Sequence, residues 1–75
     1  MKILAKHVAA QLEERPFCVV FESDLERCWP SKNMAQATRK SGIRRFAESR
    51  GWNATVLEGE FGIRAIFERL EPDPL

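Results

Sequence analysis

Apolar side chains recur at the spacing of one helical face in the first fifteen residues. The apolar positions are Leu4, Ala5, Val8, Ala9 and Leu12. Pro16 ends this pattern, because the residue before a proline resists the helical conformation. The sequence therefore predicts a first helix over residues 2–15.

Residues 17–23 are rich in β-branched and aromatic side chains, in a run too short for a helix of that composition. This pattern predicts a first strand near the middle of the sheet. Residues 24–30 are expected to form a connection. Because Ser23 and Glu26 have the spacing of a capping box, one helical turn inside this connection is an open alternative.

A second helix is predicted over residues 32–50, with Ser31 as its N-cap and Gly51 as its C-terminal stop. Smaller and apolar side chains share one side of it, at Met34, Ala37, Thr38, Ser41, Phe46 and Ala47. Gly42 lies inside the run, where glycine costs about 1 kcal/mol relative to alanine. The segment is therefore either one kinked helix or two helices.

Two further strands flank a turn that contains glycine. Residues 55–58 and 63–68 have strand character, and residues 59–62 join them as a hairpin. Residues 71–75 contain two prolines, so they are predicted to form an irregular tail after a single domain of residues 1–70.

These elements give an α+β fold in the order α-β-α-β-β. The strand, helix, strand portion is expected to form a right-handed crossover, which makes its two strands parallel. The sequence thus predicts two layers, with two helices on one face of a three-stranded mixed sheet.

Composition limits the kind of protein this is. Apolar residues at 44% and charged residues at 31% are typical of a globular domain. A chain of 75 residues buries too little surface to enclose a large internal cleft. We expect both cysteines to be reduced and the protein to be cytoplasmic, because no signal peptide or membrane-spanning run is present.

Charge is distributed unevenly along the chain. Between Ser31 and Trp52 there are six basic residues and one acidic residue, a net charge of +5. The rest of the chain has six basic and ten acidic residues, a net charge of −4. The second predicted helix is therefore the one markedly basic segment.

Cations at helical neighbours three to five residues apart are expected to form an exposed face, because burying them all costs too much desolvation. Such a face can neutralise phosphates. The residues predicted to contact nucleic acid are Arg39, Lys40, Arg44, Arg45, Arg50 and Arg64. Trp29 and Trp52 either offer stacking surfaces for unpaired bases or belong to the core. The cations alternatively pair with acids of neighbouring elements.

Residues that carry catalysis or bind metal are scarce. His7 is the only histidine, and together with Cys18 and Cys28 it gives three zinc-type ligands, which are widely spaced. We therefore predict no catalytic residues, no metal and no cofactor. Cys28 lies just before the second predicted helix. The run Cys28-Trp29-Pro30-Ser31 resembles the Cys-Pro-x-Pro site of the small sulfur-carrier proteins of tRNA thiolation, so a thiol carrier that uses Cys28 is a further alternative.

Residues 34–52 also contain part of a helix-turn-helix pattern, with Thr38, Gly42 and Ile43 at suitable positions. Glu48 breaks the pattern, because an apolar residue is needed there.

The segment from Lys40 to Phe67 also resembles part of a known family. The stretch from Ile43 to Trp52, then Glu58-Gly59-Glu60, then Arg64-Ala65-Ile66-Phe67, resembles the second half of the arginine-x-x-x-histidine single-stranded nucleic-acid-binding domain. The signature pair is absent, since Lys40 and Arg44 stand at its two positions. The resemblance implies phosphate contacts for Lys40, Arg44 and Arg64.

The leading functional hypothesis is a non-catalytic module that binds single-stranded or structured nucleic acid through phosphates. A protein-interaction module, with an acidic partner or as a homodimer, is the alternative.

Overall fold

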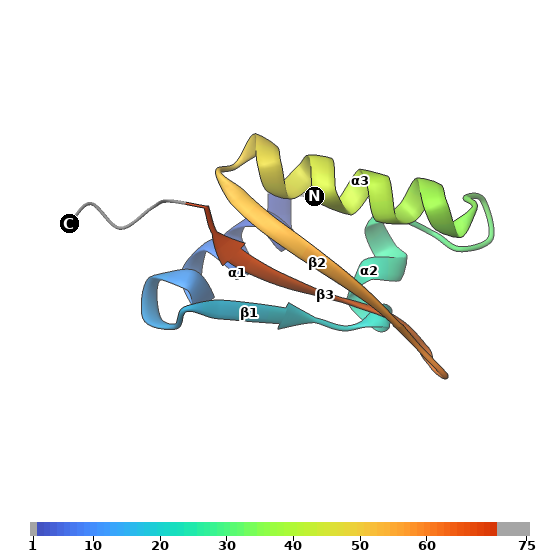
Figure 1. Ribbon diagram of the computed structural model, residues 1–75, viewed down its shortest axis with the longest axis horizontal. Helices are drawn as coiled ribbons and strands as arrows, with labels where there is room; N and C mark the ends of the chain where they lie inside the picture. The colour runs from blue at the N-terminus through green and yellow to red at the C-terminus, as the bar shows by residue number, and fades with distance from the viewer. Residues whose placement is uncertain (1, 71–75) are drawn as a thin grey trace.

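The computed structural model describes residues 2–70, which form three helices and one three-stranded sheet (Figure 1). The elements are α1 (Lys2–Glu14), β1 (Phe17–Val20), α2 (Glu22–Cys28), α3 (Gln36–Ser49), β2 (Trp52–Gly59) and β3 (Gly62–Arg69). The predicted α+β class, the first helix and the C-terminal hairpin are confirmed. The predicted tail, residues 71–75, lies outside the described residues.

The first strand ends at Val20 instead of residue 23, and a helix occupies the rest of that segment and most of the predicted connection, so the expectation of two helices is wrong. α2 begins without a side-chain cap, because the residue before it is Phe21 and Ser23 lies inside the helix. Its stability comes from packing: Leu25 is fully buried, and Trp29, four residues later, is 3% exposed. Glu22 in the first turn also interacts favourably with the helix dipole.

α3 is one continuous helix, which decides between the one-helix and two-helix alternatives and excludes a helix-turn-helix over residues 34–52. It begins at Gln36, later than predicted, and Ser31 does not cap it. Ser31 donates hydrogen bonds to Glu26 instead, from its backbone N–H at 3.0 Å and its hydroxyl at 3.1 Å. Gly42 is tolerated inside α3 because the Trp29 ring packs against it.

The sheet is antiparallel throughout, in the order β1-β3-β2, so the predicted mixed sheet is wrong. β1 and β2 do run in the same direction. However, β3 lies between them and pairs with both, so no two neighbouring strands are parallel, and β1 is an edge strand rather than the central strand that the sequence predicts. Cys18 and Ala54 both pair with Phe67, which places these three residues on the same face of the sheet.

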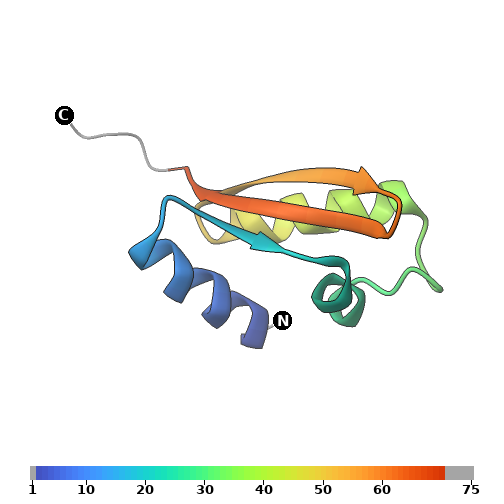
Figure 2. The same ribbon diagram turned by 90° about the horizontal axis from the view of Figure 1, so that it is seen from below.

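Within residues 2–70, all three helices cover that face, and no helix lies on the other face. The sheet residues beneath the helices are buried: Cys18, Val20, Trp52, Ala54, Ile63, Ala65 and Phe67. α1 lies against β1 and β3, α2 against β3 and α3 against β2. Figure 2 shows α1 and α2 on the same side of the sheet. The fold therefore has two layers and one open sheet face.

Four aromatic rings form the centre of the core. Phe46 on α3 makes edge-to-face contacts with Trp29, Trp52 and Phe67, at centroid separations of 5.6, 6.0 and 6.0 Å. Trp52 is 8% exposed. Both tryptophans are thus core residues rather than stacking surfaces for bases.

We predict that Gly42→Ala destabilises the protein, although alanine is the better helix former. A Cβ at residue 42 would lie 2.6 Å from Nε1 and 2.9 Å from Cδ1 of the buried Trp29 ring. Relieving such a clash in a packed core costs about 1–3 kcal/mol. Urea unfolding followed by circular dichroism measures the loss. The exposed neighbour Ser41 is the control, since Ser41→Ala should change stability by at most about 0.5 kcal/mol. Equal stability of the two variants would contradict the packing.

Candidate nucleic-acid interface

Arg39 is buried, so the expectation that it contributes to an exposed basic face is wrong. Only 2% of its surface is accessible, although it lies in the middle of the basic segment. A buried charge is tolerated when it is paired and hydrogen-bonded. The partners come from α2, from the residue that follows it and from the first turn of α3 itself.

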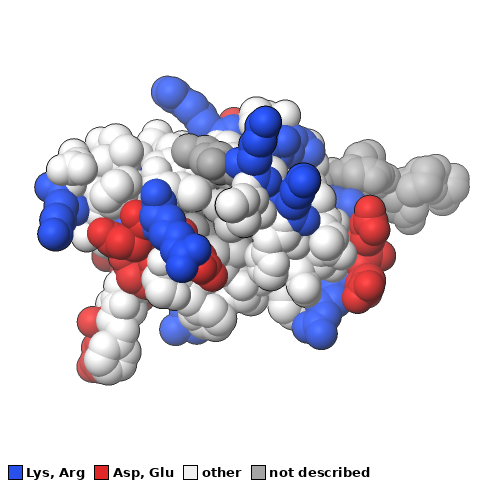
Figure 3. Space-filling model, turned by 180° about the vertical axis from the view of Figure 1, so that it is seen from behind, with Lys and Arg blue, Asp and Glu red and all other residues white. Residues whose placement is uncertain are grey.

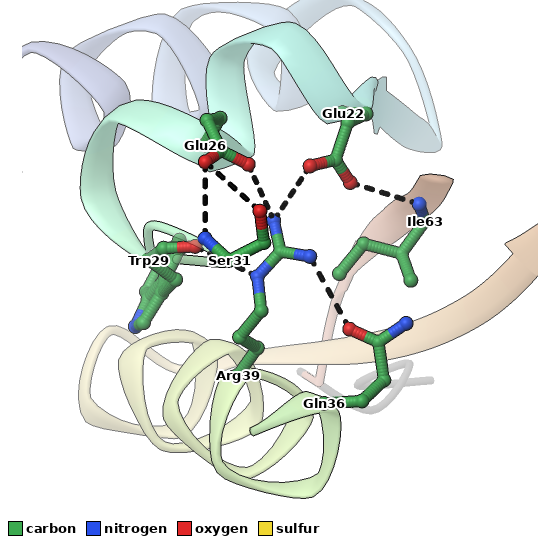
Figure 4. A network of polar contacts seen from close by, with 7 residues as sticks. All are labelled: Glu22, Glu26, Trp29, Ser31, Gln36, Arg39 and Ile63. Atoms are coloured by element: carbon green, nitrogen blue, oxygen red, sulfur yellow. Dashed lines mark hydrogen bonds and ion pairs between the residues drawn. The ribbon is translucent and has the colours of Figure 1, made fainter. Parts of the chain in front are cut away.

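The Arg39 guanidinium donates hydrogen bonds to three segments (Figure 4). Its Nε donates to the carbonyl oxygen of Trp29 at 2.7 Å, and Nη1 donates to Gln36 at 3.2 Å. Nη2 donates to Glu22 at 2.8 Å and lies 3.5 Å from Glu26. Glu22 and Glu26 are one helical turn apart on α2, so both carboxylates face α3.

Glu22 extends this network to the hairpin. Its second carboxylate oxygen accepts a hydrogen bond from the backbone N–H of Ile63 at 2.9 Å. Gly62 permits this approach, because a Cβ there would lie 2.6 Å from the Glu22 carboxylate and because its φ is +113°. Partial burial alone would raise the pKa of Glu22. The hydrogen bonds from Ile63 and Arg39, together with the Arg39 charge, outweigh burial and lower that pKa.

Lys40 is also paired. Its ammonium forms an ion pair with Glu58 near the end of β2, and its side chain is 27% exposed. Such a partly exposed pair contributes little to stability. The Glu58 carboxylate does, however, compete with any phosphate for the Lys40 ammonium. The alternative in which basic residues pair with acids of neighbouring elements is therefore confirmed for Arg39 and Lys40.

The other three cations of this segment that are predicted to contact nucleic acid are exposed. Arg44, Arg45 and Arg50 have no ion pair with any residue between 2 and 70. The Arg50 guanidinium lies 5.5 Å from the centroid of the Phe46 ring, which orients it at the end of α3. These three side chains are available to a ligand.

Arg64 does not lie with them. It is on β3 and points to the open face of the sheet, where its guanidinium is 5.8 Å from the centroid of the Phe21 ring. The helical layer lies on the opposite side of the sheet. The structure thus separates Arg64 from the cations of α3.

Sequence reasoning missed Lys6. A shallow hollow of about 360 Å³ lies between α1 and α3, and its lining includes Lys6, Arg50 and Ser49 but no carboxylate. In Figure 3, Lys and Arg side chains gather over this part of the helical layer, and acidic side chains gather elsewhere. Lys6 is exposed on the polar face of the first helix. No sequence pattern indicates that this face borders the end of α3.

A second hollow lies between α1 and α2, and its lining includes His7, Asp24 and Cys28. Its geometry gives little support to a thiol carrier that uses Cys28. Cys28 is the last residue of α2, and α3 begins only at Gln36. The helix N-terminus that was expected beside this thiol is therefore absent. Cys18 is buried, and desolvation raises the pKa of its thiol.

Within residues 2–70, no three His, Cys, Asp or Glu side chains lie close enough together to hold a metal ion. No helix in the same range is long and apolar enough to span a bilayer.

We predict that Arg39→Ala destabilises the protein by about 3–5 kcal/mol, because it leaves the Glu22 carboxylate without its cation. Arg44→Ala removes the same side chain from an exposed position of the same helix and should cost at most about 0.5 kcal/mol. Denaturant unfolding of both variants measures the difference. Similar losses would show that Arg39 is not buried and paired.

Acid should weaken the Glu22 interactions. A lowered pKa in the folded state means that the unfolded state binds more protons, so this contribution to stability is complete above the ordinary value of 4.5. It is lost as pH falls through the folded value. The stability difference between wild type and Glu22→Gln should therefore shrink as the pH drops below 4.5. Urea unfolding at several pH values measures it, and a pH-independent difference would contradict the account.

Comparisons with protein families, with curated proteins and with solved structures found no match. The resemblance of residues 40–67 to the arginine-x-x-x-histidine domain accordingly stays a prediction.

Proposed function

We propose that this domain is a non-catalytic module that binds nucleic acid through its phosphates, at a surface formed jointly by α3 and α1. The acid-free hollow between the two helices carries the proposal, because Lys6 and Arg50 line it from either side. Arg44 and Arg45 add two exposed charges on α3. We call these four residues the basic surface.

The chemistry of the basic surface favours phosphate. Arginine guanidinium groups match the geometry of phosphate oxygens, and exposed cations release condensed counterions when they bind a nucleic-acid backbone. The hollow is shallow, and the tryptophans near the helix ends are buried. Contacts to the backbone are therefore favoured over readout of bases, which supports single-stranded or structured nucleic acid of varied sequence.

The basic surface differs from the set that the sequence predicted. Arg39 is buried against α2, Lys40 is paired with Glu58 on β2, and Arg64 lies on the other face of the sheet. Lys6 joins Arg44, Arg45 and Arg50 in their place.

Fluorescence anisotropy with labelled single-stranded RNA and DNA tests this proposal. Four phosphate contacts predict that the association constant falls about 50-fold between 50 and 200 mM salt. Lys6→Ala/Arg50→Ala and Arg44→Ala/Arg45→Ala should each weaken binding about 25-fold near 0.1 M salt, for all sequences alike, because each removes two contacts. Each should also make the salt dependence shallower.

The matched control is Arg27→Ala/Lys32→Ala, which removes two exposed charges from α2 and from the loop before α3. It should bind as the wild type does. Absence of binding, or equal weakening in the control, would contradict the proposal. Equally tight binding of polyglutamate would assign the surface to acidic proteins instead.

A further inference from the structure

The open face of the sheet carries a concentration of exposed apolar side chains. Six large apolar side chains of residues 2–70 are exposed, and three of them, Phe17, Phe21 and Leu57, lie on or beside this face. Val19 and Ile66 are half-buried at its centre, where they are register partners. Exposed apolar side chains gathered on one face in this way are typical of an interaction site.

The two charges on this face are arranged symmetrically. Arg64 and Glu68 lie on the central strand β3, two residues before and two residues after Ile66. Strand geometry places them about 13 Å apart. Their register partners on β2, Leu57 for Arg64 and Asn53 for Glu68, are uncharged. Among residues 2–70, the strand residues of this face therefore have no net charge, with opposite charges at its two ends.

This balance argues against nucleic acid as the occupant. A strand of nucleic acid needs a basic groove beside its stacking platform, and Glu68 cancels the charge of Arg64 here. The same arrangement is self-complementary, which is the requirement for an interface between two copies of one chain.

We propose that this face is the interface of a homodimer. The two-fold axis lies between the two sheets, perpendicular to β3, and passes over Ile66. Rotation about it places Arg64 of each copy opposite Glu68 of the other. The same rotation brings Ile66 onto Ile66, Val19 onto Val19, and Phe17 of each copy onto Phe21 of the other.

Charge selects this axis over the other aligned arrangement. An axis parallel to the strands would place Arg64 opposite Arg64 and Glu68 opposite Glu68, and like charges across an interface are costly. Aligned sheets pack about 10 Å apart and within about 30° of each other. Long Arg and Glu side chains reach their partners over that offset.

The dimer goes beyond the proposed function. It covers the open face with a second copy and leaves both helical layers outside, so that the two basic surfaces face away from each other. A three-stranded face is at the small end of stable interfaces, so we expect a dissociation constant on the order of micromolar.

Sedimentation velocity without nucleic acid tests the dimer. Wild-type protein should change from monomer to dimer as its concentration rises from about 1 to 500 μM. In the dimer, residue 64 of each copy faces residue 68 of the other, at two symmetric positions. Arg64→Glu or Glu68→Arg puts two like charges at each position, so each variant should weaken the dimer at least about tenfold. The double variant Arg64→Glu/Glu68→Arg restores both opposite pairs and should dimerise again.

Circular dichroism of each variant checks that the fold is retained. A second readout is the concentration dependence of amide chemical shifts, which should be confined to the open face, at Val19, Thr55 and Ile66. A monomeric wild type at 500 μM would overturn the proposal. Single variants that dimerise normally, a double variant that stays monomeric, or shifts confined to α3 would also overturn it.

Discussion

The ion pair between Arg39 and Glu22 joins the parts of this fold that are distant in sequence. Arg39 belongs to α3, Glu22 to α2, and the other oxygen of the same carboxylate holds the backbone N–H of Ile63 at the start of β3. Each of these groups would be costly to bury alone. Together they satisfy one another, and within residues 2–70 no buried side-chain nitrogen or oxygen lacks a partner. The network therefore fixes where α3 lies on the sheet.

The same interaction determines which cations remain for a ligand. Because Arg39 is buried in this network and Lys40 is paired with Glu58, the exposed cations of α3 and its C-cap that have no ion pair within residues 2–70 are Arg44, Arg45 and Arg50. The position of α3 also brings Arg50 to the hollow that Lys6 of α1 lines. We propose that these cations and Lys6 together form the basic surface. The open face of the sheet carries Arg64 but none of these cations of α3.

Local patterns in the sequence were sufficient for α1 and for the β2–β3 hairpin, since helical periodicity, Pro16 and the glycine turn act over a few residues. α2 was missed because its first turn has no side-chain cap and its stability depends on burying Leu25 and Trp29. Without α2, the sequence does not predict that Glu22 and Glu26 face α3, and Arg39 is therefore predicted to be exposed. The strand order could not be predicted for a similar reason. The position of β3 between β1 and β2 depends on packing across the whole sheet, which no local segment of the sequence determines.

Exchange of the arginine Nε protons with water, followed by NMR, examines the central interaction directly. Arg39 donates from Nε to a buried carbonyl oxygen, so its proton should exchange far more slowly than that of Arg44, with protection approaching that of core backbone amides. Equal exchange rates for Arg39 and Arg44 would show that the guanidinium is solvated, and would contradict the account of how α3 is held.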